Sequence, residues 1–127
     1  MPTPEVFSRF DHLGEVAAQL PPERPTIPRA LMLALASGET DKVGRLLVND
    51  LTPAALSILP SLHATLRAGR EVGAACLGSV LSGSGPTVAF LMSNEESANQ
   101  FGAYLVEQGL AQDVRTVHSP VPGASLL

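Results

Sequence analysis

The stretch LSGSGPTVAF, residues 81–90, places the small residues GSG at 83–85 between two apolar runs. These runs, at 78–82 and 87–92, are short and contain β-branched residues, which is typical of strands joined by a tight connection. Glycines between strands are usually turn residues that adopt a positive φ. A loop of the same composition can also present successive backbone N–H groups to an anion. The sequence therefore predicts a β-hairpin, and both a plain turn and a ligand-binding loop remain open.

The standard phosphate-binding and nucleophile motifs do not fit this loop. Pro86-Thr87 follows Gly85 at the point where a P-loop needs lysine. The third glycine of G-x-G-x-x-G is missing, and a strand follows where that motif needs a helix. The nucleophile elbow G-x-S-x-G is also absent, so Ser84 is a poor candidate for a nucleophile. Binding by this loop would therefore depend on backbone N–H groups and on the hydroxyls of Ser82, Ser84 and Thr87.

Helical patterns precede the hairpin, and a helix and a strand follow it. Gly14 and Gly69 are expected to stop the first helix and the last helix before the hairpin, respectively. Ser93 and Glu96 form a capping box for the helix after it. This order predicts an α+β fold, with several helices packed on a small, mainly antiparallel sheet. Further helices are expected at 28–37, 40–48 and 53–59, and a half-buried strand at 114–118, where apolar and polar residues alternate.

Composition limits the possible classes of function. The 127 residues are 45% hydrophobic and 16% charged with a net charge of −4, which predicts one folded domain over 1–127. Without a basic stripe and with 4% aromatic residues, no nucleic-acid partner is expected. The longest apolar stretch, 30–36, is too short for a membrane span, and no secretory signal is visible. The single Cys76 excludes an intrachain disulfide, so we expect a protein of the reducing cytoplasm.

Outside the loop, few residues suggest chemistry. The histidines at 12, 63 and 118 have no metal-ligand spacing, so we expect no metal site. The pair Asn49-Asp50 ends one predicted helix and precedes the next, which favours helix capping. A second interpretation, in which this pair faces a ligand cleft, stays open.

Five stretches give the chain a resemblance to a known family. LGSVLSGSGPTVAFL at 77–91 resembles the third conserved motif of the GHMP kinase superfamily. TPEVFSRFD at 3–11, NDLTPAALSILPSL at 49–62, LRAG at 66–69 and VPGA at 121–124 follow the order of the 4-diphosphocytidyl-2-C-methyl-D-erythritol kinases, which belong to that superfamily. The resemblance covers nearly the whole chain, and it adds a functional interpretation of the loop to the turn interpretation.

The resemblance implies a small-molecule kinase. The family transfers the γ-phosphate of ATP, with Mg²⁺, to the 2-hydroxyl of 4-diphosphocytidyl-2-C-methyl-D-erythritol on the non-mevalonate route to isoprenoids. Its active site lies between two domains, and its third-motif loop lines the cleft. Carried over to this chain, the wall of the substrate and nucleotide cleft consists of Ser82, Gly83, Ser84, Gly85, Pro86 and Thr87, with Asn49 and Asp50 as further possibilities.

The resemblance also implies that this chain is only part of the kinase. The family's ATP-binding loop, catalytic aspartate and active-site lysine belong to an N-terminal domain, so we expect that domain as a partner and the chain alone to be inactive. The expected fold is the GHMP kinase C-terminal domain, a ferredoxin-like arrangement whose first strand is missing here. The alternative is a non-catalytic ligand-binding or interaction module, a truncated remnant of a kinase. Within the kinase hypothesis, Gly85→Val is expected to change only the cleft wall.

Overall fold

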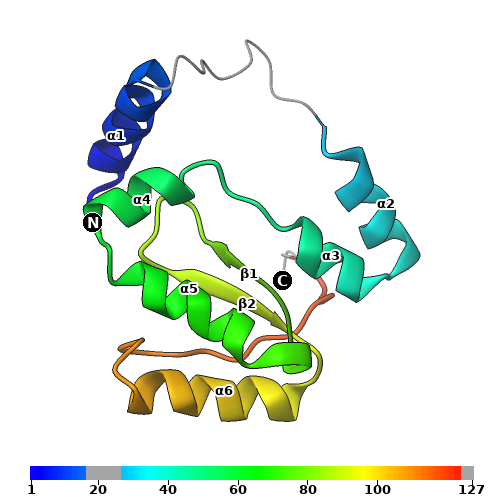
Figure 1. Cartoon of the computed structure of the whole chain (residues 1–127). Coiled ribbons are helices and arrows are strands. Elements are labelled where there is room, and N and C mark those ends of the chain that lie inside the picture. Colours follow the sequence, from blue (N-terminus) through cyan, green and yellow to red (C-terminus); the bar gives the residue numbers. More distant parts are fainter. Residues whose placement is uncertain (17–26, 124–127) are drawn as a thin grey trace, which may run out of the picture.

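The computed structural model describes residues 1–16 and 27–123. A two-stranded hairpin lies at the centre, with α5 (Leu62–Glu71) alongside it, α6 (Glu95–Glu107) below it, and α1 (Thr3–Val16) and α3 (Thr40–Leu46) toward opposite sides (Figure 1). The predicted α+β fold with a small antiparallel sheet is confirmed, and the ferredoxin-like arrangement stays a prediction. The elements are α1 (Thr3–Val16), α2 (Arg29–Ser37), α3 (Thr40–Leu46), α4 (Thr52–Ile58), α5 (Leu62–Glu71), a 3₁₀ turn (Gly73–Ala75), β1 (Cys76–Leu81), β2 (Val88–Met92) and α6 (Glu95–Glu107).

The hairpin confirms the predicted strands to within two residues at each end. β1 and β2 are antiparallel, with Leu81 opposite Val88 next to the connecting loop and Ser79 opposite Phe90 further along. Paired residues of an antiparallel ladder point to the same face. Phe90 therefore marks the face that receives α6, where its ring meets that of Phe101 edge to face at a centroid distance of 5.0 Å.

The strand predicted for 114–118 is wrong. This segment follows the surface of α6: a Cβ on Gly102 would lie 2.8 Å from Cγ1 of Val114, and the Thr116 hydroxyl donates to Oδ1 of Asn99 at 2.8 Å. Val117 is 82% exposed. Alternation in sequence is compatible with an extended chain, but it does not provide the neighbouring strand that pairing needs.

Two apolar clusters form the core. One lies at the loop end of the hairpin and joins α1, α4, α5 and β1 through Val6, Ala54, Ala55, Leu62 and Leu81. The other lies between α5 and α6 through Ala68, Phe101 and Leu105, with Phe90 and Met92 packed against it. The hairpin therefore reaches both clusters, and its connecting loop emerges beside the first one.

Three predicted helix signals are wrong. Gly14 and Gly69 lie inside α1 and α5, which continue to Val16 and Glu71. Gly69 is buried because the Phe90 ring needs its space: a Cβ there would lie 2.7 Å from Cε1 of the ring. The α6 cap is also shifted by one residue, since the backbone N–H of Ser97 donates to Oδ1 of Asn94 at 2.8 Å and Ser93 makes no cap bond.

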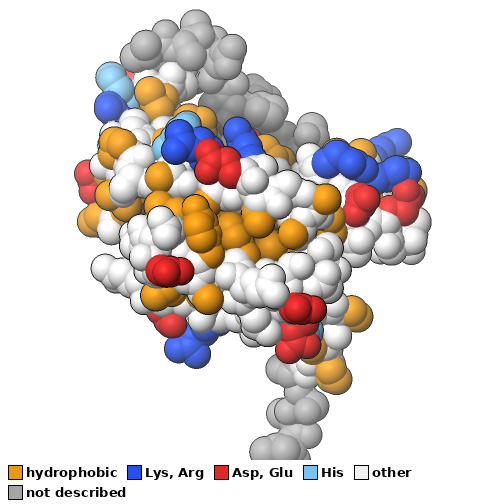
Figure 2. Space-filling model, turned by 60° about the horizontal axis from the view of Figure 1, so that its bottom comes forward, with side chains coloured by type: hydrophobic (Ala, Val, Ile, Leu, Met, Phe, Trp, Pro, Cys, Tyr) orange, Lys and Arg blue, Asp and Glu red, His pale blue; other side chains and the backbone are white. Residues whose placement is uncertain are grey.

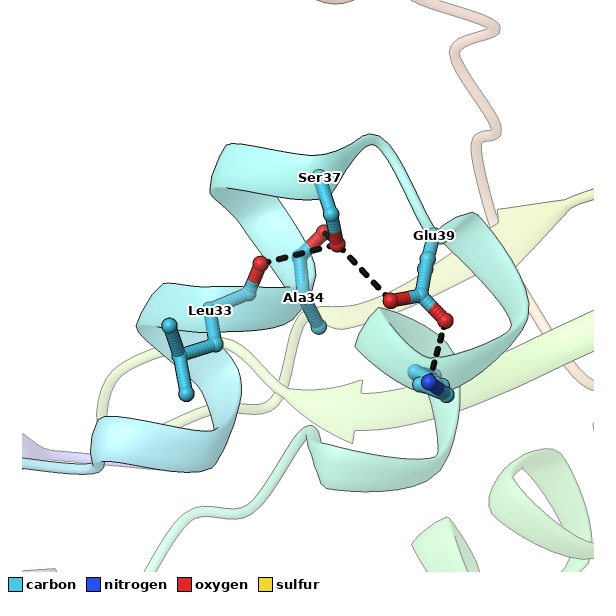
Figure 3. Close-up of polar contacts among 5 residues, drawn as sticks. Leu33, Ala34, Ser37 and Glu39 are labelled. Carbon is cyan, nitrogen blue, oxygen red and sulfur yellow. Dashed lines mark hydrogen bonds and ion pairs between the residues drawn. The ribbon is translucent and has the colours of Figure 1, made fainter.

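The α2–α3 turn is held by local polar contacts (Figure 3). The Ser37 hydroxyl lies 2.9 Å from both the Leu33 carbonyl oxygen and Oε1 of Glu39, and Glu39 forms an ion pair with Lys42. The Lys42 ammonium, followed by the Ser37 hydroxyl, lowers the pKa of the Glu39 carboxyl. Gly38 completes the turn with a φ of +68°, as an αL cap requires.

Apolar residues also reach the surface. With the lower side of Figure 1 turned forward, Figure 2 shows apolar side chains in a band across the middle of the molecule and charged side chains mostly around it. Exposed large apolar residues elsewhere include Met32 and Leu33 of α2, of which Leu33 is 71% exposed. None of the helices in residues 1–16 and 27–123 combines the length and apolar character that a membrane crossing needs.

Candidate functional site

The loop 82–87 is first of all a hairpin turn, as the glycine pattern predicts. The Ser82 N–H donates to the Thr87 carbonyl at 2.9 Å, and the Gly85 N–H donates to the Ser82 carbonyl at 2.9 Å. Gly83 and Gly85 have φ values of +56° and +77°. Residues with a Cβ rarely adopt such values, so glycine at both positions is explained by the backbone alone.

The same loop leaves backbone donors free on an exposed surface. Among the described residues, no acceptor pairs with the N–H groups of Gly83 and Ser84. Gly83 is exposed, and a Cβ there would meet no atom within 4 Å. Successive free N–H groups in a turn with positive φ form a concave site that suits an anion. The loop geometry is therefore compatible with both interpretations, a turn and a binding surface.

Asn49 ties this loop to the start of α4. Its Nδ2 donates to the carbonyl oxygens of Leu81 and Gly83, both at 2.8 Å, and its Oδ1 accepts from the Leu51 N–H at 2.9 Å. The helix cap itself is Leu51, without a side-chain hydrogen bond. The prediction that Asn49 caps the next helix is therefore wrong: its Oδ1 closes a turn before α4, and its Nδ2 reaches the last residue of β1 and Gly83 of the loop. Asp50 is exposed beside it, and no hydrogen bond or ion pair joins Asp50 to the described part of the chain.

The first turn of α1 meets the loop from another side. The Thr3 and Ser84 hydroxyl oxygens lie 2.9 Å apart and share a hydrogen bond. The two residues are 81 positions apart in the sequence, which explains why no local pattern indicated this contact. The only sequence signal was that Thr3 and Ser84 both lie in stretches that carry the family resemblance.

Gly85 lies close to side chains beneath the loop. A Cβ there would lie 2.8 Å from Cδ1 of Leu81, whose side chain is 2% exposed, and 2.9 Å from Cε of Met1. The expectation that Gly85→Val changes only the cleft wall is therefore wrong, since this substitution also presses on the core cluster beneath the loop. Gly83, with open space around it, is the better position for testing the loop.

Other polar groups do not gather at the loop. Within the described residues, no group of three or more His, Cys, Asp or Glu side chains could hold a metal ion. Two surface hollows lie elsewhere, one between α1 and α4 around Arg9 and Ser57, and one at the start of α6 around Glu96. Burial raises the pKa of the Cys76 thiol, which disfavours the nucleophilic thiolate.

What the loop can do chemically follows from its composition. Residues 82–87 include no charged side chain, so the loop can donate hydrogen bonds from N–H groups and hydroxyls but cannot neutralise charge or take up a proton. Such a surface orients a polar ligand, and other groups must supply acid–base or cationic chemistry.

Comparison with known families places the chain. Residues 31–111 match the family model described as GHMP kinases C terminal, and this segment contains the loop and Asn49. The match covers more than half of the chain, so the chain belongs to this family. The resemblance seen in the sequence motifs is thereby confirmed.

Individual relatives show which members of the family the chain is similar to. The chain is 46% identical over 125 residues to a protein of Nocardia farcinica and 44% identical over 125 residues to one of Thermobifida fusca. A Streptomyces coelicolor protein is likewise 44% identical. Each is named 4-diphosphocytidyl-2-C-methyl-D-erythritol kinase. The alignments cover 98% of this chain but only 38% to 40% of each relative, so the chain spans about two fifths of the length of these kinases.

Proposed function

We propose that this chain is the C-terminal domain, residues 1–127, of a kinase that phosphorylates the 2-hydroxyl of 4-diphosphocytidyl-2-C-methyl-D-erythritol with ATP, on the non-mevalonate route to isoprenoids. The observation that carries this proposal is the alignment of 98% of the chain with kinases of that name at 44% to 46% identity. The substrate comes from their name. The reaction type is inferred from the family motifs in the sequence. The loop offers hydrogen-bond donors that suit a phosphorylated ligand.

The loop residues Ser82 to Thr87 form one wall of the proposed cleft. Phosphoryl transfer depends on holding the phosphates and the attacking hydroxyl in line and on stabilising the charge of the transferred group. Free N–H groups at Gly83 and Ser84 can donate to phosphate oxygens or to oxygens of the substrate. Asp50, exposed beside Asn49, is the remaining candidate for this wall.

ATP and Mg²⁺ need more than residues 1–16 and 27–123 offer. Mg²⁺ is bound by carboxylates together with phosphate oxygens, and the loop has no carboxylate. Among the described residues no acidic cluster makes up for this. The N-terminal domain is therefore proposed as the partner that binds the metal and most of the nucleotide, which also predicts that the chain alone does not catalyse the reaction.

The alternative function is a non-catalytic module that keeps the fold and a ligand surface. The uncharged loop is as compatible with this alternative as with the kinase, because binding without catalysis needs no acid, base or metal ligand. The two functions differ in what happens when the missing groups are supplied.

The test is reconstitution. The part of the Nocardia farcinica kinase that this chain does not match is mixed with the 127-residue chain, and ATP-dependent phosphorylation of 4-diphosphocytidyl-2-C-methyl-D-erythritol is followed. Each part alone is the control. Activity only in the mixture is expected. Activity of the chain alone would contradict the proposal that the N-terminal domain supplies the metal and nucleotide site. No activity in any sample, including a covalent fusion of the two parts, would favour the non-catalytic module.

A further inference from the structure

Asn49 has contacts that a helix cap does not need. Its Oδ1 accepts from the Leu51 N–H in a turn that precedes α4, whose cap is Leu51 itself, and both hydrogens of Nδ2 go to carbonyls of the hairpin, those of Leu81 and Gly83. We infer that Asn49 is a positioning residue, which aims the backbone donors of the loop 82–87 toward the ligand. This inference rests on the proposed kinase function and adds a residue to it.

The orientation of the amide follows from its partners. Oδ1 has no hydrogen to donate, and Nδ2 has two. Rotating the amide by 180° would place oxygen against the carbonyls of Leu81 and Gly83 and the NH₂ group against the Leu51 N–H, so all three hydrogen bonds would be lost. Only one orientation satisfies every group, and the Asn49 side chain is half-buried in it.

Peptide geometry transmits this contact to the loop donors. In a trans peptide the C=O of one residue and the N–H of the next point in opposite directions. Because the Gly83 carbonyl points to Nδ2 of Asn49, the Ser84 N–H points away from Asn49, where no described residue accepts from it. The Leu81 carbonyl, held in the same way, directs the Ser82 N–H toward its acceptor, the Thr87 carbonyl.

The chain contains a matched asparagine for comparison. Asn94 also accepts from a backbone N–H through Oδ1, that of Ser97, but its Nδ2 donates only to the neighbouring Ser93 hydroxyl at 3.2 Å. Replacing either asparagine by aspartate keeps the acceptor and removes the NH₂ group. Asn49→Asp therefore removes the loop contacts and preserves the contact to Leu51, whereas Asn94→Asp preserves everything that its cap needs.

The first arm of the test measures amide hydrogen exchange on the 127-residue chain. For Asn49→Asp and Asn49→Ala, exchange at Ser82 and Gly85 is expected to become at least tenfold faster than in the parent chain. The Leu51 amide is expected to stay protected with aspartate and to lose protection with alanine. Asn94→Asp is expected to leave the loop amides unchanged. Loop exchange that stays at the parent rate in both Asn49 variants would overturn the inference.

The second arm measures turnover in the fusion of this chain to the remainder of the Nocardia farcinica kinase. Asn49→Asp is expected to lower kcat about tenfold or more, with a smaller change in KM, because misplaced donors affect the transition state most. Asn94→Asp is expected to match the parent fusion. Faster loop exchange with unchanged kcat would overturn the positioning role. If the parent fusion is inactive, the proposed kinase function fails, and the exchange arm still decides whether Asn49 holds the loop.

Discussion

At one end of the β1–β2 hairpin, Gly83 adopts a positive φ in open space, and a Cβ there would meet no atom within 4 Å. At the other end, Gly78 lies against Gly44 of α3, and a Cβ on Gly78 would come within 2.6 Å of the Gly44 Cα. The same residue type thus serves two purposes, a backbone shape at the loop and a close approach of two elements at the far end. Substitutions at the two ends should consequently affect different properties of the protein.

The largest expected effect is at the far end. Gly78→Ala forces α3 and β1 apart because its Cβ meets backbone, which cannot rotate away, and overpacking of this kind costs up to about 3 kcal/mol. Domains are stable by only about 5 to 15 kcal/mol, so a large shift of the urea midpoint is expected. The control is Gly123→Ala, where a Cβ meets nothing within 4 Å and no positive φ is required. Equal midpoints for the two variants would contradict the close-approach explanation.

A medium effect is expected at Thr65, which joins α5 to the end of α6. Its side chain is only 9% exposed, and its hydroxyl donates to the Leu110 carbonyl at 2.9 Å. Thr65→Val removes the donor, and the unfolding free energy is expected to fall by about 1 kcal/mol. Thr65→Ser keeps the hydroxyl and should retain this hydrogen bond. If valine proves no worse than serine in urea unfolding, the hydrogen bond does not contribute to stability.

The smallest effect concerns Glu39, whose pKa is lowered by Lys42 and then by Ser37. A carboxyl with a lowered pKa in the folded state contributes stability above its unfolded pKa, and this contribution is lost as pH falls through the folded value. Lys42→Gln removes the larger cause, so the Glu39 pKa is expected to rise. An NMR titration of the Glu39 carboxyl checks this, and an unchanged midpoint in Lys42→Gln would show that the ion pair does not act on it.

The contrast between the two ends also explains what could be predicted from the sequence. The hairpin and its glycine loop were predictable because the turn glycines, two positions apart, lie between short apolar runs that contain β-branched residues. Gly44 and Gly78 are 34 positions apart, and neither carries a local sign of the contact. From the sequence alone Gly69 looks like a helix stop. The structure shows instead that glycine is needed there because the Phe90 ring packs against it.

The candidate site was predicted only in part, because only some of its contacts join residues that are close in the sequence. Ser82 to Thr87 form one continuous stretch that could be named from sequence, and this assignment stays a prediction. The contact between Thr3 and Ser84 and the two hydrogen bonds from Asn49 to the hairpin depend on the tertiary fold. The segment 114–118 shows the reverse case: a local strand pattern occurs in a segment that lies along α6 without pairing to a strand.

The most direct test of the loop as a cleft wall compares Gly83→Asn with Gly38→Asn in the fusion kinase. Both glycines have a positive φ, +56° and +68°, and open surroundings, and asparagine tolerates such a φ, so both variants should remain folded. The loop assignment predicts that kcat/KM falls about tenfold or more for Gly83→Asn, because the new side chain occupies ligand space, and stays at the parent value for Gly38→Asn. Equal kcat/KM values for the two variants would contradict it and leave the loop as a turn alone.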